Sequence, residues 1–353
     1  MHAHGSSPAS RPAAPPRAQA GLARARILGT GAFLPPVVRT NRDLERLVDT
    51  SDAWITERTG IRERRLAPEG TTTSDMGAIA ALAALDMAGL RATDLDLIVV
   101  ATVTPDMPMP SAAALVQHKI GAGPCPAFDI GAACAGFIFA LTVAEQFIRT
   151  GKRHRVLVVG GDTLTKFLDW TDRKTCILFG DGAGAVVLGS DVAVDAQDRP
   201  RGVLSTSLST DGSLVPALYI PGGGSAHPPS AATVEGRLHF IRMNGQEIFK
   251  HAIKNLVSAS HAALDDAGMT TAGIDWVCAH QANKRILDQV AIRLGTAPDR
   301  MLSNIDRVGN TSSASIPILL DESVRAGKIK DGDTVLMSAL GAGVSWGGAV
   351  VRM

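Results

Sequence analysis

Long apolar runs alternate with amphipathic stretches along most of the chain. Residues 74–90 are rich in alanine, and their polar positions recur as on the exposed face of a helix. Residues 95–102, 155–159 and 184–189 are short and almost uninterrupted apolar runs, which are typical of strands buried on both faces of a sheet. Buried strands that alternate with helices predict an α/β fold built in layers.

One plan of helix, strand, loop, helix and strand occurs twice. Gly89 and Asp96 in the first copy recur as Gly268 and Asp275 in the second, at one and the same interval. A repeat that spans about half of the chain predicts two similar halves instead of one continuous sheet. We place the N-terminal half, with the candidate nucleophile described below, at residues 25–195, and the C-terminal half at residues 196–353.

The start of the chain, residues 1–24, differs in composition from the rest. It is rich in Ala, Pro, Ser and Arg and lacks the apolar segment of a secretory signal. We interpret residues 1–24 as a disordered extension, with a transit peptide as the alternative.

Composition and charge exclude several classes of protein. Lys plus Arg is 35 and Asp plus Glu is 34 in 353 residues, a balance that does not favour nucleic-acid binding. No apolar run reaches the ~18 residues of a membrane span. The four cysteines stand at irregular intervals without a CxxC pair, which favours neither zinc nor a disulfide framework. We therefore expect a cytoplasmic protein with reduced thiols.

One of the cysteines has the setting of a nucleophile. Cys134 stands in a run of small residues directly before an apolar helix, so that the backbone can turn sharply and the N-terminus of the helix can face the sulfur. Such a position lowers the pKa of a thiol and favours the reactive thiolate. A buried structural cysteine is the alternative. Cys125, Cys176 and Cys278 lack this setting, and we expect Cys176 and Cys278 in the core.

Two further polar residues end apolar segments in the second half. His280 follows a buried strand, at the edge where α/β sheets bind ligands. Asn310 precedes Lys328 by the same interval at which Cys134 precedes Lys152, so the two loops could face each other across the repeat. Taken singly, a structural histidine and an asparagine that caps a helix are the commoner cases.

Six segments together resemble β-ketoacyl-[acyl-carrier-protein] synthase III, the condensing enzyme that starts bacterial fatty-acid synthesis. They are residues 49–65, 126–137, 179–185, 280–286, 309–317 and 341–349. The resemblance runs from about Ala25 to Met353, in the order and spacing of the family. It implies a thiolase-like fold, in which two similar βαβαβαβ halves form a five-layered αβαβα core, and a homodimer.

The resemblance also implies a reaction. An acyl-CoA starter condenses with malonyl-acyl-carrier protein, with loss of CO2, through an acyl-cysteine intermediate, and the product is 3-oxoacyl-acyl-carrier protein. The implied catalytic residues are Cys134, His280 and Asn310, and the backbone N–H groups of Cys134 and Ala342 would hold the oxyanion. No metal or redox cofactor is implied.

Substrate contacts follow from the same resemblance. The residues implied for coenzyme A and its pantetheine arm are Trp54, Arg58, Arg173 and Asn283. The patch implied for docking of the carrier protein consists of Lys250, Arg285 and Arg293. Met109 stands where many members have phenylalanine, at the position where one subunit closes the acyl pocket of its neighbour.

Two departures from the family pattern leave the choice of acyl group open. Ala342 replaces a glycine of the family, and residues 220–235 resemble a surface insertion. One alternative is a specialised relative with the same triad that loads an unusual acyl starter in secondary metabolism. A second is a non-catalytic module that binds an acyl group or a carrier protein. A thiolase would need a second cysteine in residues 341–353, which contain none, and Asn310 disfavours hydroxymethylglutaryl-CoA synthase.

Overall fold

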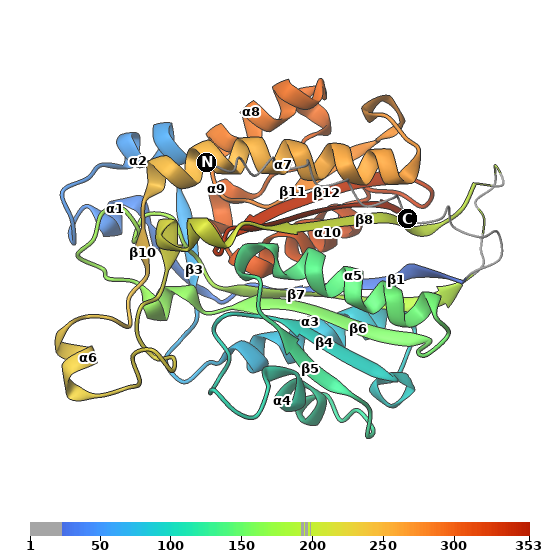
Figure 1. Cartoon of the computed structure of the whole chain (residues 1–353), viewed down its shortest axis with the longest axis horizontal. Coiled ribbons are helices and arrows are strands. Elements are labelled where there is room, and N and C mark those ends of the chain that lie inside the picture. The colour runs from blue at the N-terminus through green and yellow to red at the C-terminus, as the bar shows by residue number, and fades with distance from the viewer. Residues whose placement is uncertain (1–22, 192–193, 195–196, 198) are drawn as a thin grey trace, which may run out of the picture.

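The computed structural model of the chain describes residues 23–191, 194, 197 and 199–353 (Figure 1). Strand β1 begins at Arg24. The extension expected at residues 1–24 therefore lies almost wholly outside the described residues.

Two sheets divide the chain between them. The first has the strand order β1(Arg24–Phe33), β7(Gly182–Asp191), β6(Arg155–Asp162), β4(Leu97–Ala101), β5(Ala127–Ile130). The second has the order β11(Trp276–Ala279), β12(Thr334–Gly341), β13(Ser345–Arg352), β8(Gly202–Thr210). Strand β4 runs parallel to β5 and β6, and β11 runs parallel to β12, whereas the other pairs are antiparallel. The chain changes sheet between β7 and β8, where the boundary between the two halves was placed.

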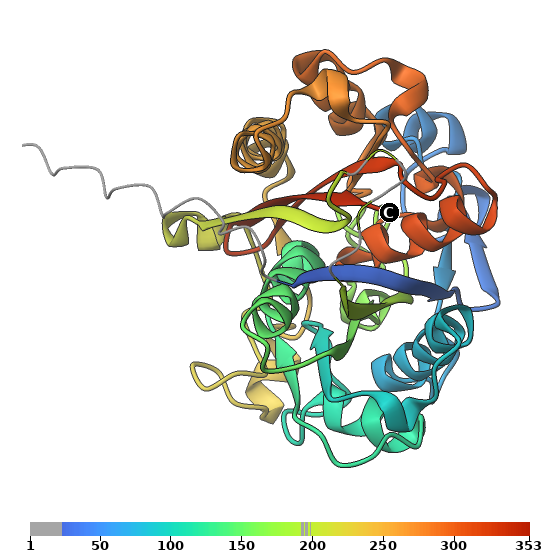
Figure 2. The same cartoon turned by 90° about the vertical axis from the view of Figure 1, so that its right-hand side faces the viewer.

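Helices fill three layers around these sheets, as Figure 2 shows edge-on. The outer face of the first sheet carries α3(Thr73–Ala88) and α4(Ala112–Lys119), and the outer face of the second carries α7(Gly245–Ala267) and α8(Lys284–Leu294). Between the sheets lie α5(Gly136–Arg149) and α10(Ser315–Arg325). The layers are therefore αβαβα, which confirms the expected fold class.

The burial of both sheet faces explains the uninterrupted apolar runs. In β4, Leu97 and Val99 belong to the core between the sheets, whereas Ile98 and Val100 pack in the core under α3 and α4. Because successive strand residues point to opposite faces, a strand covered on both sides needs an apolar residue at every position.

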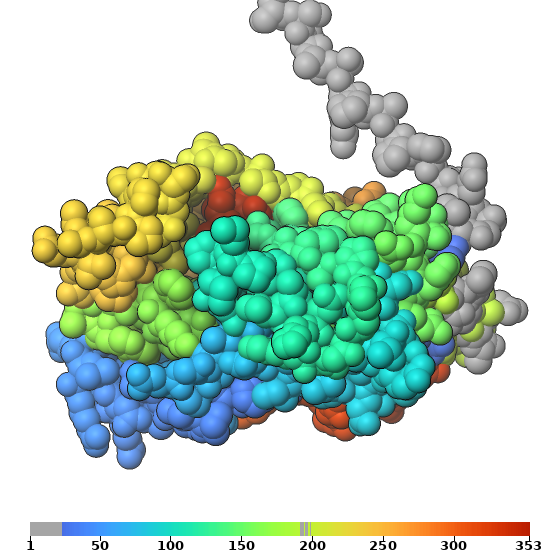
Figure 3. Space-filling view, turned by 90° about the horizontal axis from the view of Figure 1, so that it is seen from below, coloured from blue at the N-terminus to red at the C-terminus, as the bar shows by residue number. Residues whose placement is uncertain are grey.

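Shorter elements surround one end of the layers. The two-stranded sheet of β2(Val37–Thr40) and β3(Glu63–Leu66) contacts α1(Asn41–Leu44) and α9(Ile305–Val308), and α2(Asp52–Thr59) contacts α1. Residues 220–235, expected as a surface insertion, belong to the connection from β9(Leu218–Tyr219) to β10(Arg242–Met243). They include the whole of α6(Ala231–Glu235) and are exposed for most of their length. Figure 3 shows this segment in yellow, beside a hollow with red atoms of the C-terminal part at its bottom. Within the described residues, no helix combines the length and apolarity needed to span a bilayer.

Candidate active site

The nucleophile candidate sits in a tight turn that the second half repeats. Cys134 lies in the 3₁₀ turn Ala133–Ala135 directly before α5, and the turn Ser312–Ala314 stands directly before α10. Both turns begin at a residue with positive φ, 46° at Ala133 and 54° at Ser312. The structural counterpart of Cys134 is thus Ser313, at the same interval that relates Gly89 to Gly268.

The pairing of Cys134 with Asn310 that the sequence suggested is therefore wrong by three positions. Helix α5 has 14 residues and α10 has 11. The sequence comparison counted back from Lys152 and Lys328, which follow the two helices. Because α10 is shorter than α5, this count misaligns the two turns by the difference in helix length. Asn310 nevertheless reaches the same site, since it lies just before the second turn.

A buried carboxylate ties the second turn to the first half of the chain. Asp162, at the end of β6, accepts hydrogen bonds from the backbone N–H (3.3 Å) and hydroxyl (2.8 Å) of Ser313 in the second half. Its other oxygen accepts bonds from the first half, from Thr102 Oγ1 (3.0 Å), Val103 N (2.9 Å) and Thr104 Oγ1 (3.0 Å). Five donors on one fully buried carboxylate compensate its desolvation and fix the halves relative to each other.

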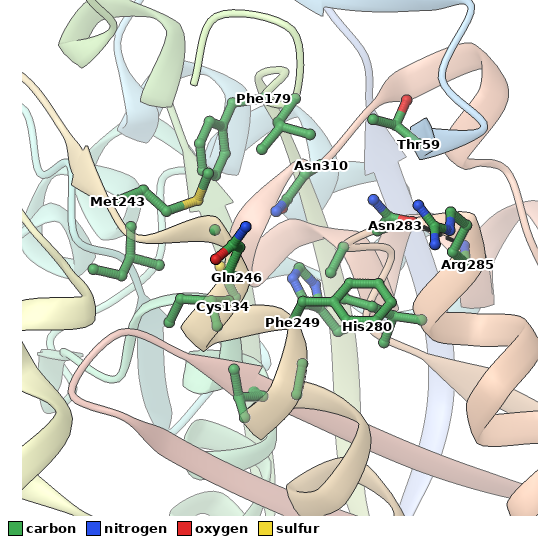
Figure 4. A pocket seen from close by; sticks show the side chains of 18 of the residues that line it. Thr59, Cys134, Phe179, Met243, Gln246, Phe249, His280, Asn283, Arg285 and Asn310 are labelled. Carbon is green, nitrogen blue, oxygen red and sulfur yellow. Dashed lines mark hydrogen bonds between the residues drawn. The ribbon is translucent and has the colours of Figure 1, made fainter. Parts of the chain in front are cut away.

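Backbone pairing fixes the position of Asn310. Its N–H donates to Leu178 O (2.9 Å), and its carbonyl accepts from Gly180 N–H (2.9 Å). The side-chain oxygen accepts a bond from the Ser312 N–H (2.9 Å), so the amide nitrogen remains as the donor. Figure 4 shows this nitrogen directed into the cavity that also contains Cys134 and His280.

His280 follows β11 and has a single side-chain partner in the described part of the molecule. Its Nδ1 lies 2.6 Å from the Ser315 hydroxyl, in the first turn of α10. Burial lowers the pKa of His280 to about 3, so the imidazole is neutral at physiological pH. A neutral ring with Nδ1 engaged presents only Nε2 to the cavity.

The pKa of the candidate nucleophile departs from the expectation. Burial, with a smaller contribution from the nearby charge of Asp162, raises the pKa of the Cys134 thiol to about 12. The Ser312 side chain and the backbone N–H of Cys134 act in the opposite direction. The sequence predicted a lowered pKa from the position before α5, but desolvation of the sulfur outweighs those effects in the substrate-free site.

The thiol stands where two cavities meet. A cavity of about 470 Å³ is lined by Cys134, His280 and Asn310 and extends to Arg58 and Arg285 (Figure 4). A second, mostly apolar cavity of about 240 Å³ also reaches Cys134; its lining includes Val103, Leu164, Tyr219, Ile220, Ile241, Ser312 and Ala342. This geometry provides one path for a polar carrier and a separate chamber for an apolar group.

The residues expected to bind coenzyme A gather at the mouth of the larger cavity. The guanidinium groups of Arg58 and Arg173 lie 4.8 and 4.9 Å from the ring centre of Trp54. Asn283 lines the cavity, and its amide donates to the Arg58 carbonyl (3.1 Å). Arg58 lines the cavity itself, whereas Trp54 and Arg173 stand outside its lining.

The remaining expected residues lie on the surface. Arg285 and Arg293 line a third cavity beside Phe249, and Lys250 is exposed on the neighbouring helix α7. Met109 is 84% exposed and lines neither cavity at Cys134. Its assignment concerns the pocket of a neighbouring subunit and stays a prediction.

Sequence reasoning missed four residues of the site: Asp162, Ser312, Ser315 and Gly341. Ser312 and Ser315 lie in the serine-rich segment that directly follows Asn310. A Cβ on Gly341 would lie 2.7 Å from Cys134 N and 2.5 Å from Ala132 O. Strand β12 can therefore approach the nucleophile turn only because this residue has no side chain. Among the residues that the structure describes, His, Cys, Asp and Glu form no group of three that could hold a metal ion.

A buried thiol, a neutral imidazole and an amide donor between two cavities of an αβαβα fold define a condensing enzyme of the thiolase-like class. The protein-family model of 3-oxoacyl-[acyl-carrier-protein] synthase III matches residues 128–212, and the model of the C-terminal part of this family matches residues 264–353. The chain belongs to the β-ketoacyl-[acyl-carrier-protein] synthase III family, as its relatives show. This confirms the expected family and the expected enzyme class, an acyltransferase.

The similarity extends over nearly the whole chain. The β-ketoacyl-[acyl-carrier-protein] synthase III of Caldanaerobacter subterraneus subsp. tengcongensis is 49% identical over 92% of this chain and 97% of its own. The crystal structure of 3-oxoacyl-[acyl-carrier-protein] synthase III from Aquifex aeolicus VF5 has a TM-score of 0.85 and 43% identity, covering 93% of this chain and 100% of that one. The priming β-ketosynthase of the R1128 polyketide biosynthetic pathway has a TM-score of 0.85 and 34% identity, over 96% and 99% of the two chains.

Gly341→Ala tests the contact between β12 and the nucleophile turn. We expect the added methyl group to push the two apart, to destabilise the fold by roughly 1–3 kcal/mol and to slow acylation of the enzyme. Denaturant unfolding and the burst of CoA release measure the two effects. Gly212→Ala is the matched control, because a Cβ there meets no atom within 4 Å. Unchanged stability and burst in Gly341→Ala would show that the close approach is unimportant.

Proposed function

We propose that Cys134, His280 and Asn310 carry out a decarboxylating Claisen condensation of an acyl-CoA starter with malonyl-acyl-carrier protein, the step that initiates fatty-acid synthesis. The observation that supports these roles is the meeting of the three side chains in one cavity, at the point where a second, apolar cavity begins. The proposed reaction uses no cofactor beyond the thioester substrates.

The first half-reaction transfers the acyl group to the enzyme. The Cys134 thiol loses its proton, and Sγ attacks the carbonyl carbon of the acyl-CoA. The backbone N–H groups of Cys134 and Ala342 stabilise the oxyanion. The bond from the carbonyl carbon to the CoA sulfur then breaks, and that sulfur takes up a proton. The acyl chain occupies the apolar cavity. The acyl-cysteine intermediate splits one difficult condensation into two easier steps.

The second half-reaction forms the carbon–carbon bond. Malonyl-acyl-carrier protein loses CO2, and the electron pair of the broken bond moves onto the thioester oxygen as an enolate. His280 Nε2–H and the Asn310 amide donate hydrogen bonds to that oxygen; one such donor is worth ~10²–10³ in rate. The enolate carbon attacks the acyl-cysteine, and Cys134 leaves as the thiolate, which takes up a proton from solvent to regenerate the thiol.

Ser315 supplies the tautomer that this step requires. When Nδ1 of a neutral imidazole accepts a hydrogen bond, the proton of the ring is held on Nε2. The Ser315 hydroxyl lies 2.6 Å from Nδ1, and we assign it as the donor. The donor to the enolate is thereby fixed before the substrate arrives.

The substrate contacts and the assembly extend the proposal. Trp54, with the guanidinium groups of Arg58 and Arg173 beside its ring, offers a stacking surface for the adenine of coenzyme A, and Asn283 lies on the path of the pantetheine arm. A basic patch would receive the acidic carrier protein; it comprises Lys250, Arg285 and Arg293. We further propose a homodimer in the cytoplasm, in which Met109 closes the acyl cavity of the neighbouring subunit.

A specialised starter enzyme is the second candidate function. The fold similarity to a priming β-ketosynthase of a polyketide pathway, with a TM-score of 0.85 and 34% identity, is the observation behind this candidate. The two candidates share the mechanism and differ in the acyl group, so a panel of acyl-CoAs with malonyl-acyl-carrier protein separates them. A preference for acetyl or short branched chains supports fatty-acid initiation. A non-catalytic binding module would form no covalent acyl adduct with any member of the panel.

Cys134→Ala should abolish acyl transfer and keep malonyl decarboxylation, because the enolate donors stay in place.

The rate of CO2 release by Cys134→Ala should change less than about twofold between pH 8 and 6. The lowered pKa of His280, about 3, keeps the imidazole neutral throughout this window, so no activity is lost as the pH falls. A decline centred near pH 6.5 would mean that His280 titrates normally and that the neutral donor is wrong.

Asn310→Ala should spare the acylation of Cys134 and reduce condensation by about 10²-fold or more. The amide stabilises a charge that arises only in the second half-reaction. Rapid mixing with acyl-CoA should still give a full burst of CoA release, while steady-state turnover falls. Equal loss of the burst and of turnover would contradict this division of roles.

Met109→Phe should shift the chain-length preference towards acetyl. Met is flexible and can repack around a longer chain, whereas a phenyl ring is a rigid wall. Each buried methylene contributes only ~0.8 kcal/mol, so the shift should be graded. The measurement is kcat/KM for acyl-CoAs of two, four, six and eight carbons. An unchanged profile in an intact dimer would remove Met109 from the pocket.

A further inference from the structure

Ser312 is a buried residue of the active site whose hydroxyl the fold does not use. The residue is fully buried, and within the described residues no group lies in hydrogen-bond geometry to Oγ, although Ser312 is near enough to the Cys134 thiol to lower its pKa. Buried hydroxyls are normally paired, and an unpaired one destabilises the fold. Ser312 also lines the apolar cavity together with Cys134, Ala133 and Ala342. The hydroxyl and the sulfur therefore belong to the lining of one chamber that is otherwise almost entirely apolar.

The backbone indicates that this placement is specific. Ser312 has φ of 54°, in the left-handed region that favours glycine. A serine at such a position is strained, whereas glycine would not be, so the side chain is retained at an energetic cost. The counterpart in the first half is Ala133, the residue before the nucleophile, with φ of 46°. The repeat thus places a hydroxyl on one turn against the thiol on the other.

We propose that the Ser312 hydroxyl donates a hydrogen bond to the Cys134 thiolate as the thiolate forms. Ser312 is then a further catalytic residue of the acylation step, and it acts on the nucleophile instead of on the enolate. The inference rests on the proposed function, since it takes Cys134 as the nucleophile.

The surroundings of the sulfur explain why such a donor is needed. The titratable groups that face the thiol are His280, from the end of β11, and Asp162, from the end of β6. His280 is neutral and offers no positive charge, while the carboxylate of Asp162 disfavours a thiolate. Burial raises the pKa of Cys134, whereas the Ser312 side chain lowers it. The backbone N–H of Cys134 lowers this pKa as well. A neutral donor with no competing partner is free to turn to the sulfur when the negative charge appears.

The test is the pH dependence of the alkylation of Cys134 by iodoacetamide, followed by peptide mapping. In Ser312→Ala we expect the midpoint to rise by about one pH unit or more, and the rate at pH 7.5 to fall about tenfold. Ser312→Gly also lacks the hydroxyl but relieves the backbone strain. If the alkylation midpoint rises equally in this variant, the effect belongs to the hydroxyl. This variant also serves as the test if the alanine variant fails to fold. Thr311→Val is the matched control, because it removes a neighbouring unpaired hydroxyl that lines neither cavity.

A second measurement separates the sulfur from the enolate. In a Cys134→Ala background, adding Ser312→Ala should leave malonyl decarboxylation unchanged within about twofold, because no thiolate is present to stabilise. An unchanged alkylation midpoint in both Ser312 variants, or a tenfold loss of decarboxylation in this background, would overturn the role of Ser312. Failure of the proposed function itself has a different signature, since iodoacetamide or the acyl group would then label the wild-type chain at a cysteine other than Cys134.

Discussion

The active site depends on one carboxylate that belongs to neither cavity. Asp162 accepts hydrogen bonds from Thr102, Val103 and Thr104 in the first half and from Ser313 in the second. The Cys134 turn and the loop with Asn310 come from different halves. This junction, together with the backbone bonds of Asn310 to Leu178 and Gly180, therefore fixes the position of one relative to the other. The hydrogen bonds from five donors to a buried charge depend strongly on direction, whereas an apolar contact does not. The same charge makes the neighbouring thiolate harder to form, and the site must compensate locally.

The chemistry follows from burial as much as from residue identity. Burial keeps His280 neutral and so makes it a hydrogen-bond donor of defined tautomer, held by Ser315. It also keeps Cys134 protonated in the empty site. These two effects have opposite consequences for the two half-reactions. The donors for decarboxylation have their required form in the free enzyme, whereas the thiolate of Cys134 must be stabilised before it can attack. Backbone N–H groups and the Ser312 hydroxyl are the neutral donors that can stabilise this thiolate.

Much of this architecture could be predicted from the sequence, because its physical causes are local. The apolar runs became β4, β6 and β7 since both of their faces are covered, and the repeated plan of helices and strands became the two halves. The register between Cys134 and the second half could not be predicted, because the shorter α10 changes the count without leaving a sign in the residues. The pKa of the thiol and the pairing of Asp162 depend on contacts between the halves. Gly341 matters only through its distance from the Cys134 turn.

The most direct test of this account is the site of acylation. The wild-type chain is incubated in turn with acyl-CoAs of two to eight carbons, without malonyl-acyl-carrier protein, and analysed by intact mass and peptide mapping. The account predicts a single acyl group per chain, carried by Cys134, with Cys125, Cys176 and Cys278 unmodified. An adduct on any of those three cysteines, or no adduct with any acyl-CoA of the series, would contradict it.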